Sequence, residues 1–132
     1  MLVITKKYKI YKKLLVPSIG VGLKYNDRWY PVEVFVDSGA TYSVFHTGVA
    51  ERIGLNYRAG ELIYVAVGDG GLISVFLHSL YVQLGEEVFR AVIGFSDKLG
   101  IGFNLLGRKS FFERFKVCFD EKNKLVTFQK NL

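Results

Sequence analysis

The segment best suited to chemistry is residues 34–41, Val-Phe-Val-Asp-Ser-Gly-Ala-Thr, in which an apolar strand runs directly into Asp37. A carboxylate at the end of a buried strand is energetically costly, so its presence there indicates a functional role. Ser38 can donate or accept a hydrogen bond beside that carboxylate, and Gly39 lets another backbone or a ligand approach closely. The alternative is that Asp-Ser-Gly forms an ordinary β-turn, which these residue types favour.

Other reactive side chains are scattered along the chain. His46 and His78 have no His, Cys or acid nearby at metal-ligand spacing, so neither a metal site nor a cofactor is expected. A Ser-His-Asp triad is disfavoured because His46 is expected beyond the strand that follows the acid. The single cysteine, Cys118, cannot form an intrachain disulfide and is expected to pack as a small apolar residue. Its isolation favours a reducing, cytoplasmic location.

The elements that would position Asp37 are mainly β-strands. Short runs rich in Val, Ile, Tyr and Phe alternate with Gly, Asn and Asp, a pattern typical of antiparallel β-structure. Thr47 is expected to cap a helix that runs to Ile53 and ends at Gly54. A second short helix is predicted over residues 108–114. Strands are predicted at residues 16–24, 29–36, 62–67, 72–84, 87–95, 115–119 and 125–128.

The chain has 132 residues, half of them apolar, which is enough for one compact domain with a buried core. It carries 18 Lys and Arg against 12 Asp and Glu. Five of these lysines lie in residues 1–13 without an acid, which leaves 13 basic and 12 acidic residues elsewhere. We therefore predict a lysine-rich N-terminal strand or extension at residues 1–13 and a single domain at residues 14–132. No stretch approaches the ~20 apolar residues that span a bilayer, so no membrane span is expected.

Three motifs, in order and at plausible separations, resemble those of the retropepsin-like aspartic proteases, the single-domain relatives of pepsin. The first resembles the active-site motif, the second the tip of the flap hairpin, and the third the Gly-Arg motif that begins the C-terminal helix. The resemblance covers about residues 15–128 and implies an all-β, closed-barrel-like retropepsin fold with a flap hairpin and one short C-terminal helix. The motifs are Asp37-Ser38-Gly39-Ala40, Gly68-Asp69-Gly70-Gly71-Leu72-Ile73 and Phe103-Asn104-Leu105-Leu106-Gly107-Arg108.

The resemblance implies an aspartic endopeptidase that is active as a homodimer, with one Asp37 from each chain. Two carboxylates within a few ångströms cannot both ionise easily, so one keeps its proton while the other is charged. The ionised carboxylate would deprotonate a shared water, and the protonated one would hydrogen-bond the peptide carbonyl. The implied partner is a peptide or protein in an extended conformation, and the implied chemistry needs no metal or cofactor.

The same resemblance implies roles for the neighbouring residues. Ser38 would hydrogen-bond across the dimer, Gly39 would offer its backbone to the substrate, and Ala40 completes the supporting loop. The flap, roughly residues 65–75, would close over the substrate and exclude water. Side-chain pockets for apolar substrate residues would be lined by five residues, for each of which ordinary core packing is the alternative: Phe35, Val44, Ile73, Phe103 and Leu105.

Two positions depart from the retroviral pattern. Those proteases usually have an acid four residues after the catalytic Asp, paired with the Arg of the Gly-Arg motif, whereas this chain has Thr41. Arg108 therefore loses its expected partner, and a cellular member of the family is favoured over a viral one. The flap tip carries Asp69 where a hydrophobic residue is common, so acid is expected to favour closure of two flaps near a dimer axis.

Two other functions remain open at this stage. The first is a catalytically inactive module of the same fold that mediates dimerisation or binds peptides. The second is a small basic β domain that binds nucleic acid through its N-terminal lysines. Basic residues are not interleaved with aromatic ones across the body of the chain, so no nucleic-acid partner is expected. A lysine-protected edge strand is the simpler account of residues 1–13.

Overall fold

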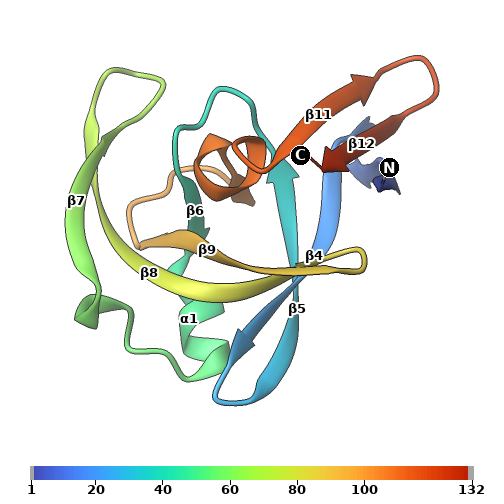
Figure 1. Cartoon of the computed structure of the whole chain (residues 1–132). Helices are drawn as coiled ribbons and strands as arrows, with labels where there is room; N and C mark the ends of the chain where they lie inside the picture. Colours follow the sequence, from blue (N-terminus) through green and yellow to red (C-terminus); the bar gives the residue numbers. More distant parts are fainter. Residues whose placement is uncertain (1, 131–132) are drawn as a thin grey trace.

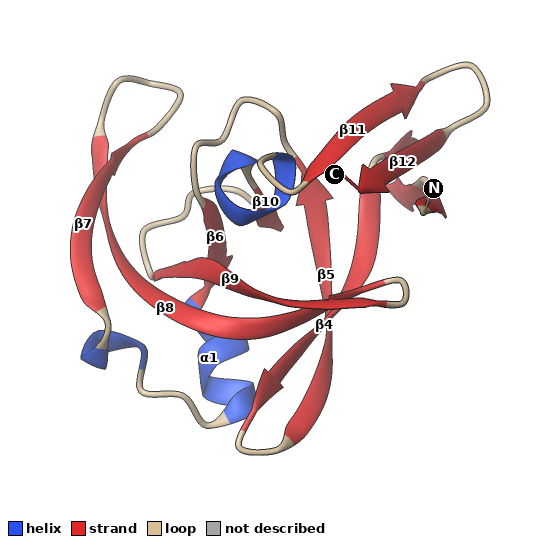
Figure 2. Ribbon diagram, viewed as in Figure 1, coloured by secondary structure: helices blue, strands red, loops and turns tan. Residues whose placement is uncertain are grey.

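The computed structural model describes residues 2–130, which form a mainly β structure (Figures 1 and 2). The helical segments are α1 (Thr47–Ile53), the 3₁₀ turn η1 (Tyr57–Ala59) and the π-helical turn η2 (Arg108–Phe112). Within the described residues, no helix has the length and apolar character needed to cross a bilayer. The strands are β1 (Val3–Lys7), β2 (Lys9–Tyr11), β3 (Leu14–Val16), β4 (Ser18–Tyr25), β5 (Arg28–Val36), β6 (Ser43–His46), β7 (Glu61–Ala66), β8 (Leu72–Leu84), β9 (Glu87–Ser96), β10 (Asn104–Leu106), β11 (Phe115–Asp120) and β12 (Leu125–Lys130).

The main sheet has seven strands in the order β4-β5-β10-β6-β9-β8-β7. Strand β4 also pairs with β8, so the sheet curls back on itself around the core. The long strand β8 sweeps from the flap hairpin to β4 (Figure 1). This arrangement confirms the predicted all-β, barrel-like retropepsin fold.

Short turns connect the strands as the sequence predicts. Asn26 and Asp27 have φ angles of 49° and 60°, so both occupy the left-handed region that a two-residue type I′ turn between β4 and β5 requires. Strands β7 and β8 form the hairpin that the resemblance assigns to the flap, and the strands predicted at residues 115–119 and 125–128 pair as the hairpin β11–β12. Local turn chemistry therefore accounts for the order of the antiparallel strands.

The core holds the strands around Asp37 in place. Val34, Phe45 and Leu106 have no exposed surface, and Val36, the residue before Asp37, keeps only 2%. These side chains come from β5, β6 and β10, which are neighbours in the main sheet. Each such burial contributes about 1.5–3 kcal/mol, so the end of β5 is rigidly placed.

The N-terminal residues pack on the domain. Strand β1 pairs with β12 along its whole length, and Ile4 is buried in the core. Tyr8 keeps 6% of its surface and donates a hydrogen bond from its hydroxyl to Glu121 Oε1 at 3.0 Å. Burial and the Glu121 carboxylate raise the pKa of Tyr8 to about 12. The first and last strands of the described residues, β1 and β12, therefore lie side by side (Figure 1).

Both predicted helices differ in detail from the expectation. Helix α1 ends at Gly54 with φ 82°, as predicted, but its N-cap is His46 and not Thr47, and no side chain caps it. The segment predicted as a second helix is only the irregular turn η2, in which Lys109 is extended and Ser110 has φ 71°. The Ser110 hydroxyl accepts a hydrogen bond from the Val92 N–H at 2.9 Å, a tertiary contact that accompanies the break in the helix.

The prediction that Cys118 packs as an apolar residue is wrong, because its side chain is exposed. Strand β11 pairs only with β12, and it lies at the edge of its three-stranded sheet. Successive side chains of a strand point to opposite faces of the sheet, and one face of this edge strand is open to solvent. Cys118 lies on the open face, and its neighbours in the sequence are the half-buried Val117 and the exposed Phe119.

Candidate active site

Asp37 lies immediately after β5 and is fixed there by the neighbouring strand. Its N–H donates to the Leu106 carbonyl at 2.9 Å, which extends the parallel pairing of β5 with β10 by one residue. The side chain is half-buried. The acid is thus carried on the rigid end of a core strand, although it lies almost seventy positions from its β10 partner in the sequence.

The loop after Asp37 turns back onto the carboxylate. Asp37 Oδ1 accepts a hydrogen bond from the Gly39 N–H at 2.8 Å, and the Asp37 carbonyl accepts one from the Ala40 N–H at 3.2 Å. Ser38 and Gly39 are exposed, and a Cβ atom at Gly39 would lie 3.2 Å from Asp37 Oδ1. The Asp-Ser-Gly segment is therefore a turn, as the simpler interpretation held, and this turn presents the carboxylate at the surface of the single chain.

The Gly-Arg motif holds this loop from the other side. The Arg108 N–H donates to the Ala40 carbonyl at 2.9 Å, and the Lys109 N–H donates to the Thr41 carbonyl at 2.8 Å. The Gly107 N–H donates to the hydroxyl of Ser43, which is fully buried, at 2.9 Å. Three consecutive backbone N–H groups, those of Gly107, Arg108 and Lys109, thus hydrogen-bond the segment that follows Asp37.

Glycine is needed at position 107 because there is no room for a side chain, and not because the backbone adopts an angle that favours glycine. Its φ of −104° is accessible to any residue, but an added Cβ atom would lie 2.4 Å from the Tyr42 carbonyl oxygen and 2.8 Å from that of Ala40. Real side chains do not approach backbone oxygens so closely. The two segments can therefore lie this close together only because position 107 is glycine.

Arg108 has a partner despite the missing acid. Its Nη2 donates to Thr41 Oγ1 at 3.0 Å, so a hydroxyl replaces the carboxylate found in the retroviral pattern. The contact is exposed and joins a cation to a neutral acceptor. Position 41 thus keeps the connection between the two motifs but adds no negative charge near Asp37.

The flap tip is held in a turn by Asp69. Its Oδ1 accepts a hydrogen bond from the Gly71 N–H at 2.8 Å, while the Val67 N–H donates to the Gly71 carbonyl at 2.9 Å. Gly70 has φ 86°, a conformation that favours glycine. The Gly-Asp-Gly-Gly sequence is therefore explained by turn geometry as well as by any role over a substrate.

A cavity of about 800 Å³ lies between the flap and the Asp37 loop. Of the predicted site residues, Asp37, Gly39, Ala40, Val44, Gly68, Asp69, Ile73 and Leu105 line it. Ser38, Gly70, Gly71, Leu106, Gly107 and Arg108 are not part of its lining.

Phe35 and Phe103 are also outside this cavity. The two rings stack on one another with centroids 4.6 Å apart and planes at 19°. Phe103 instead contributes to a second cavity together with Tyr11. The structure thus brings Val44, Ile73 and Leu105 to the Asp37 cavity and leaves the aromatic pair beside it.

Several residues that line the Asp37 cavity were not predicted from the sequence. The loop 97–103 between β9 and β10 contributes Lys98, Leu99 and Ile101, and β7 contributes the exposed Tyr64. Two glycines with apolar residues between them, in the sequence Leu-Gly-Ile-Gly, were the available signal for a loop that lies against a cavity.

Charged groups in the cavity are few. Besides Asp37 and Asp69, the lining includes Lys98, whose Nζ lies 3.9 Å from Asp97 Oδ2 in an exposed and loose ion pair. Among residues 2–130, no three His, Cys, Asp or Glu side chains are placed to hold a metal ion. A water molecule or an amide is the natural partner for a carboxylate in such a cavity.

Comparisons with known proteins agree with this geometry. Residues 21–96, which include Asp37 and the flap, match a family model described as aspartyl protease. A search of curated protein sequences found no significant match.

Three solved structures have a similar fold. A retropepsin-like aspartic protease from Rickettsia conorii has a TM-score of 0.70 and 18% identity, with 96% of this chain and 91% of that chain covered. The retroviral protease-like domain of Ddi1 from Leishmania major has a TM-score of 0.56 and 20% identity, covering 89% and 96%. EIAV protease in complex with the inhibitor HBY-793 has a TM-score of 0.54 and 24% identity, covering 76% and 88%.

Proposed function

Because this chain belongs to the aspartyl protease family and has a retropepsin-like fold, we propose that it is an aspartic endopeptidase that acts as a homodimer. The observation that carries the proposal is the position of Asp37. Its carboxylate sits on the end of a core strand, faces an 800 Å³ cavity and lies beneath a β-hairpin. This is the arrangement needed to activate a water beside an extended peptide.

A second chain is required because one chain supplies half of the acid–base pair. Within the described part of the chain, the only other carboxylate that lines the cavity belongs to Asp69, which is engaged with the Gly71 N–H at the flap tip. A C₂ dimer would bring a second Asp37 to the first across the symmetry axis. Ser38 is exposed beside it in the single chain, where it is free to hydrogen-bond across such an interface.

The proposed reaction uses the two Asp37 carboxyl groups in complementary states. Like charges held a few ångströms apart favour one shared proton, and the resulting titration belongs to the pair. The ionised carboxylate takes a proton from the water as its oxygen attacks the peptide carbonyl carbon. The protonated carboxyl group hydrogen-bonds the carbonyl oxygen and stabilises the charge that develops there. The tetrahedral diol then collapses, and the amine leaves with a proton.

The substrate would lie extended between the Asp37 loop and the flap. The backbone of Gly39 is exposed there, and the flap strands offer main-chain groups from above. Val44, Ile73 and Leu105 present apolar side chains to the same space, which suits apolar residues beside the cleaved bond. These roles, and a contribution from the half-buried Phe35 and Phe103 beside the cavity, form part of the proposal.

The proposal is tested by incubating the protein with a diverse peptide pool between acid and neutral pH. Asp37→Asn keeps the shape of the side chain but removes the ionisable group, so it serves as the control. Cleavage by the wild type and not by the variant supports the assignment. No cleavage at any pH, or equal cleavage by both proteins, supports the inactive peptide-binding module in its place.

A mixing experiment tests the shared site. Adding an equal amount of the Asp37→Asn protein should lower the activity per wild-type chain to about one half, because mixed dimers form at random. Activity per wild-type chain that is unchanged after the two proteins are unfolded and refolded together would contradict a shared active site.

A further inference from the structure

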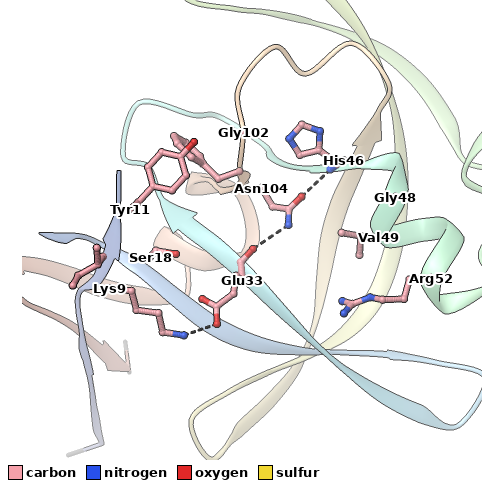
Figure 3. A pocket seen from close by; sticks show the side chains of 12 residues that line it. Lys9, Tyr11, Ser18, Glu33, His46, Gly48, Val49, Arg52, Gly102 and Asn104 are labelled. Atoms are coloured by element: carbon pink, nitrogen blue, oxygen red, sulfur yellow. Dashed lines mark hydrogen bonds and ion pairs between the residues drawn. The ribbon is translucent and has the colours of Figure 1, made fainter. Parts of the chain in front are cut away.

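A second cavity has a volume of about 560 Å³. Figure 3 shows the side chains that line it. The loop 97–103 takes part in both, because residues 98–101 line the Asp37 cavity and residues 102–103 line the second one. The remaining walls of the second cavity come from β2, β5, helix α1, the end of β6 and the first residues of β4 and β10. Nothing in the proposed cleavage reaction uses this cavity.

The two cavities follow one another along the same pair of strands. Val44 of β6 is paired with Leu105 of β10, and both side chains line the Asp37 cavity. His46 and Phe103 each lie two residues further along and line the second cavity. Residues two positions apart on a strand share a face and are about 7 Å apart. An extended peptide over Asp37 would therefore need only a few more residues to reach the second cavity.

The walls of the second cavity are tied together by hydrogen bonds (Figure 3). The Asn104 side chain accepts from the His46 N–H at 2.8 Å and donates to the Glu33 carbonyl at 3.0 Å. The Glu33 carboxylate in turn forms an ion pair with Lys9 of β2. One side chain thus connects three strands, so the cavity has a defined shape without a ligand.

One positively charged side chain in this cavity, Arg52, has no carboxylate partner among the described residues and can bind an anion. Arg52 donates one N–H to the Pro31 carbonyl at 2.6 Å, and no carboxylate among residues 2–130 forms an ion pair with it. Lys9 is already neutralised by Glu33. The Nε2 atom of His46 is buried and has no hydrogen-bond partner in the described part of the chain. The guanidinium is therefore the unmatched charge, and its planar N–H groups suit a carboxylate.

We propose that the second cavity binds an acidic side chain of the peptide substrate, four to six residues from the cleaved bond, with Arg52 as the main contact, because Arg52 contacts the carbonyl of Pro31, six positions before Asp37 on β5. This inference rests on the proposed protease function, whose site it extends. It adds a preference for Glu or Asp at a distance to the preference for apolar residues beside the cleaved bond.

The test uses matched peptides that carry Glu or Gln at each position from four to six on either side of the cleaved bond. Because Arg52 is exposed, the wild type should cleave the best Glu peptide with a KM about two- to fivefold lower than its Gln counterpart. The value of kcat should not change, since the contact is made equally in the ground and transition states.

Two variants should abolish this preference by different routes. Arg52→Gln removes the cation, and Gly48→Glu adds a carboxylate one helical turn away that can occupy Arg52 in place of the substrate. An added side chain at Gly48 meets no atom within 4 Å, so this variant is expected to fold. The matched control is Arg28→Gln, which removes an exposed arginine from the β4–β5 turn, outside the cavity. It should keep the preference.

A measurement of peptide binding tests the second cavity independently of the proposed protease activity. Fluorescence anisotropy with the Asp37→Asn protein measures binding of the labelled Glu and Gln peptides without cleavage. The second site is supported if the Asp37→Asn protein binds the Glu peptide more tightly than the Gln peptide and the additional substitution Arg52→Gln removes this difference. This result would hold even if no cleavage is found. Equal KM values and equal binding of the two peptides, or a preference that survives both Arg52→Gln and Gly48→Glu, would overturn it.

Discussion

Replacing Gly107 with alanine should disrupt the connection between the two motifs around Asp37. The new methyl group would lie 2.4 Å from the Tyr42 carbonyl oxygen and 2.8 Å from that of Ala40, both of them backbone atoms. To remove this steric overlap, residues 107–109 must move away from residues 40–43. This movement weakens the hydrogen bonds that Gly107, Arg108 and Lys109 donate to residues 40–43. Overpacking costs about 1–3 kcal/mol, and the partial weakening of the three hydrogen bonds adds about 1 kcal/mol in total. We therefore expect a loss of about 2–4 kcal/mol.

Urea denaturation followed by tryptophan fluorescence and circular dichroism measures this loss as a change in the free energy of unfolding. Gly100→Ala is the matched control, because an added Cβ atom there meets nothing within 4 Å. The control should stay within about 0.5 kcal/mol of the wild type. The reasoning would be refuted by a Gly107→Ala protein that unfolds with a free energy equally close to that of the wild type.

Two further predictions concern charge. Because the pKa of Tyr8 is raised to about 12, its contribution to stability is complete below pH 10 and is lost as the pH rises toward 12. The free energy of unfolding should fall by about 2–3 kcal/mol more in the wild type than in Tyr8→Phe over this window, and parallel pH curves would contradict the assignment. Asp69→Asn keeps the oxygen that accepts the Gly71 N–H but removes the flap charge, so it should lower KM about twofold at low ionic strength and change it little at high salt, which screens the charge. A KM ratio that does not depend on salt would show that charge at the flap tip has no influence on closure.

Much of the fold could be predicted because its signals are local. The Asn26-Asp27 turn, the glycine-rich flap tip and the Gly54 helix end each depend on backbone angles within a few residues. Alternating apolar residues then identify the strands on either side. The predicted helix at residues 108–114 is the exception, because Ser110 leaves the helical conformation and bonds to Val92 across the sheet.

The environment of individual side chains could not be predicted in the same way. Cys118 has the neighbours of a core residue, yet it is exposed because β11 is an edge strand with a single partner. Position 41 is Thr in place of the acid expected to pair with Arg108, and only the structure shows that the Thr41 hydroxyl accepts a hydrogen bond from Arg108. These outcomes depend on which strands become neighbours, and strand order is not encoded in any short segment.

The sequence by itself determined the class of fold, the candidate acid and the motifs that resemble those of an aspartic protease. It did so because each motif is a short run of residues whose types are set by local backbone geometry and chemistry. The tertiary structure decided which residues share a cavity with Asp37 and revealed the second cavity around Arg52. Leu106 and Asp37 are far apart in the chain, and they meet only because β5 and β10 pair within a sheet that curls back on itself. Distances of this kind are fixed by the packing of the whole domain.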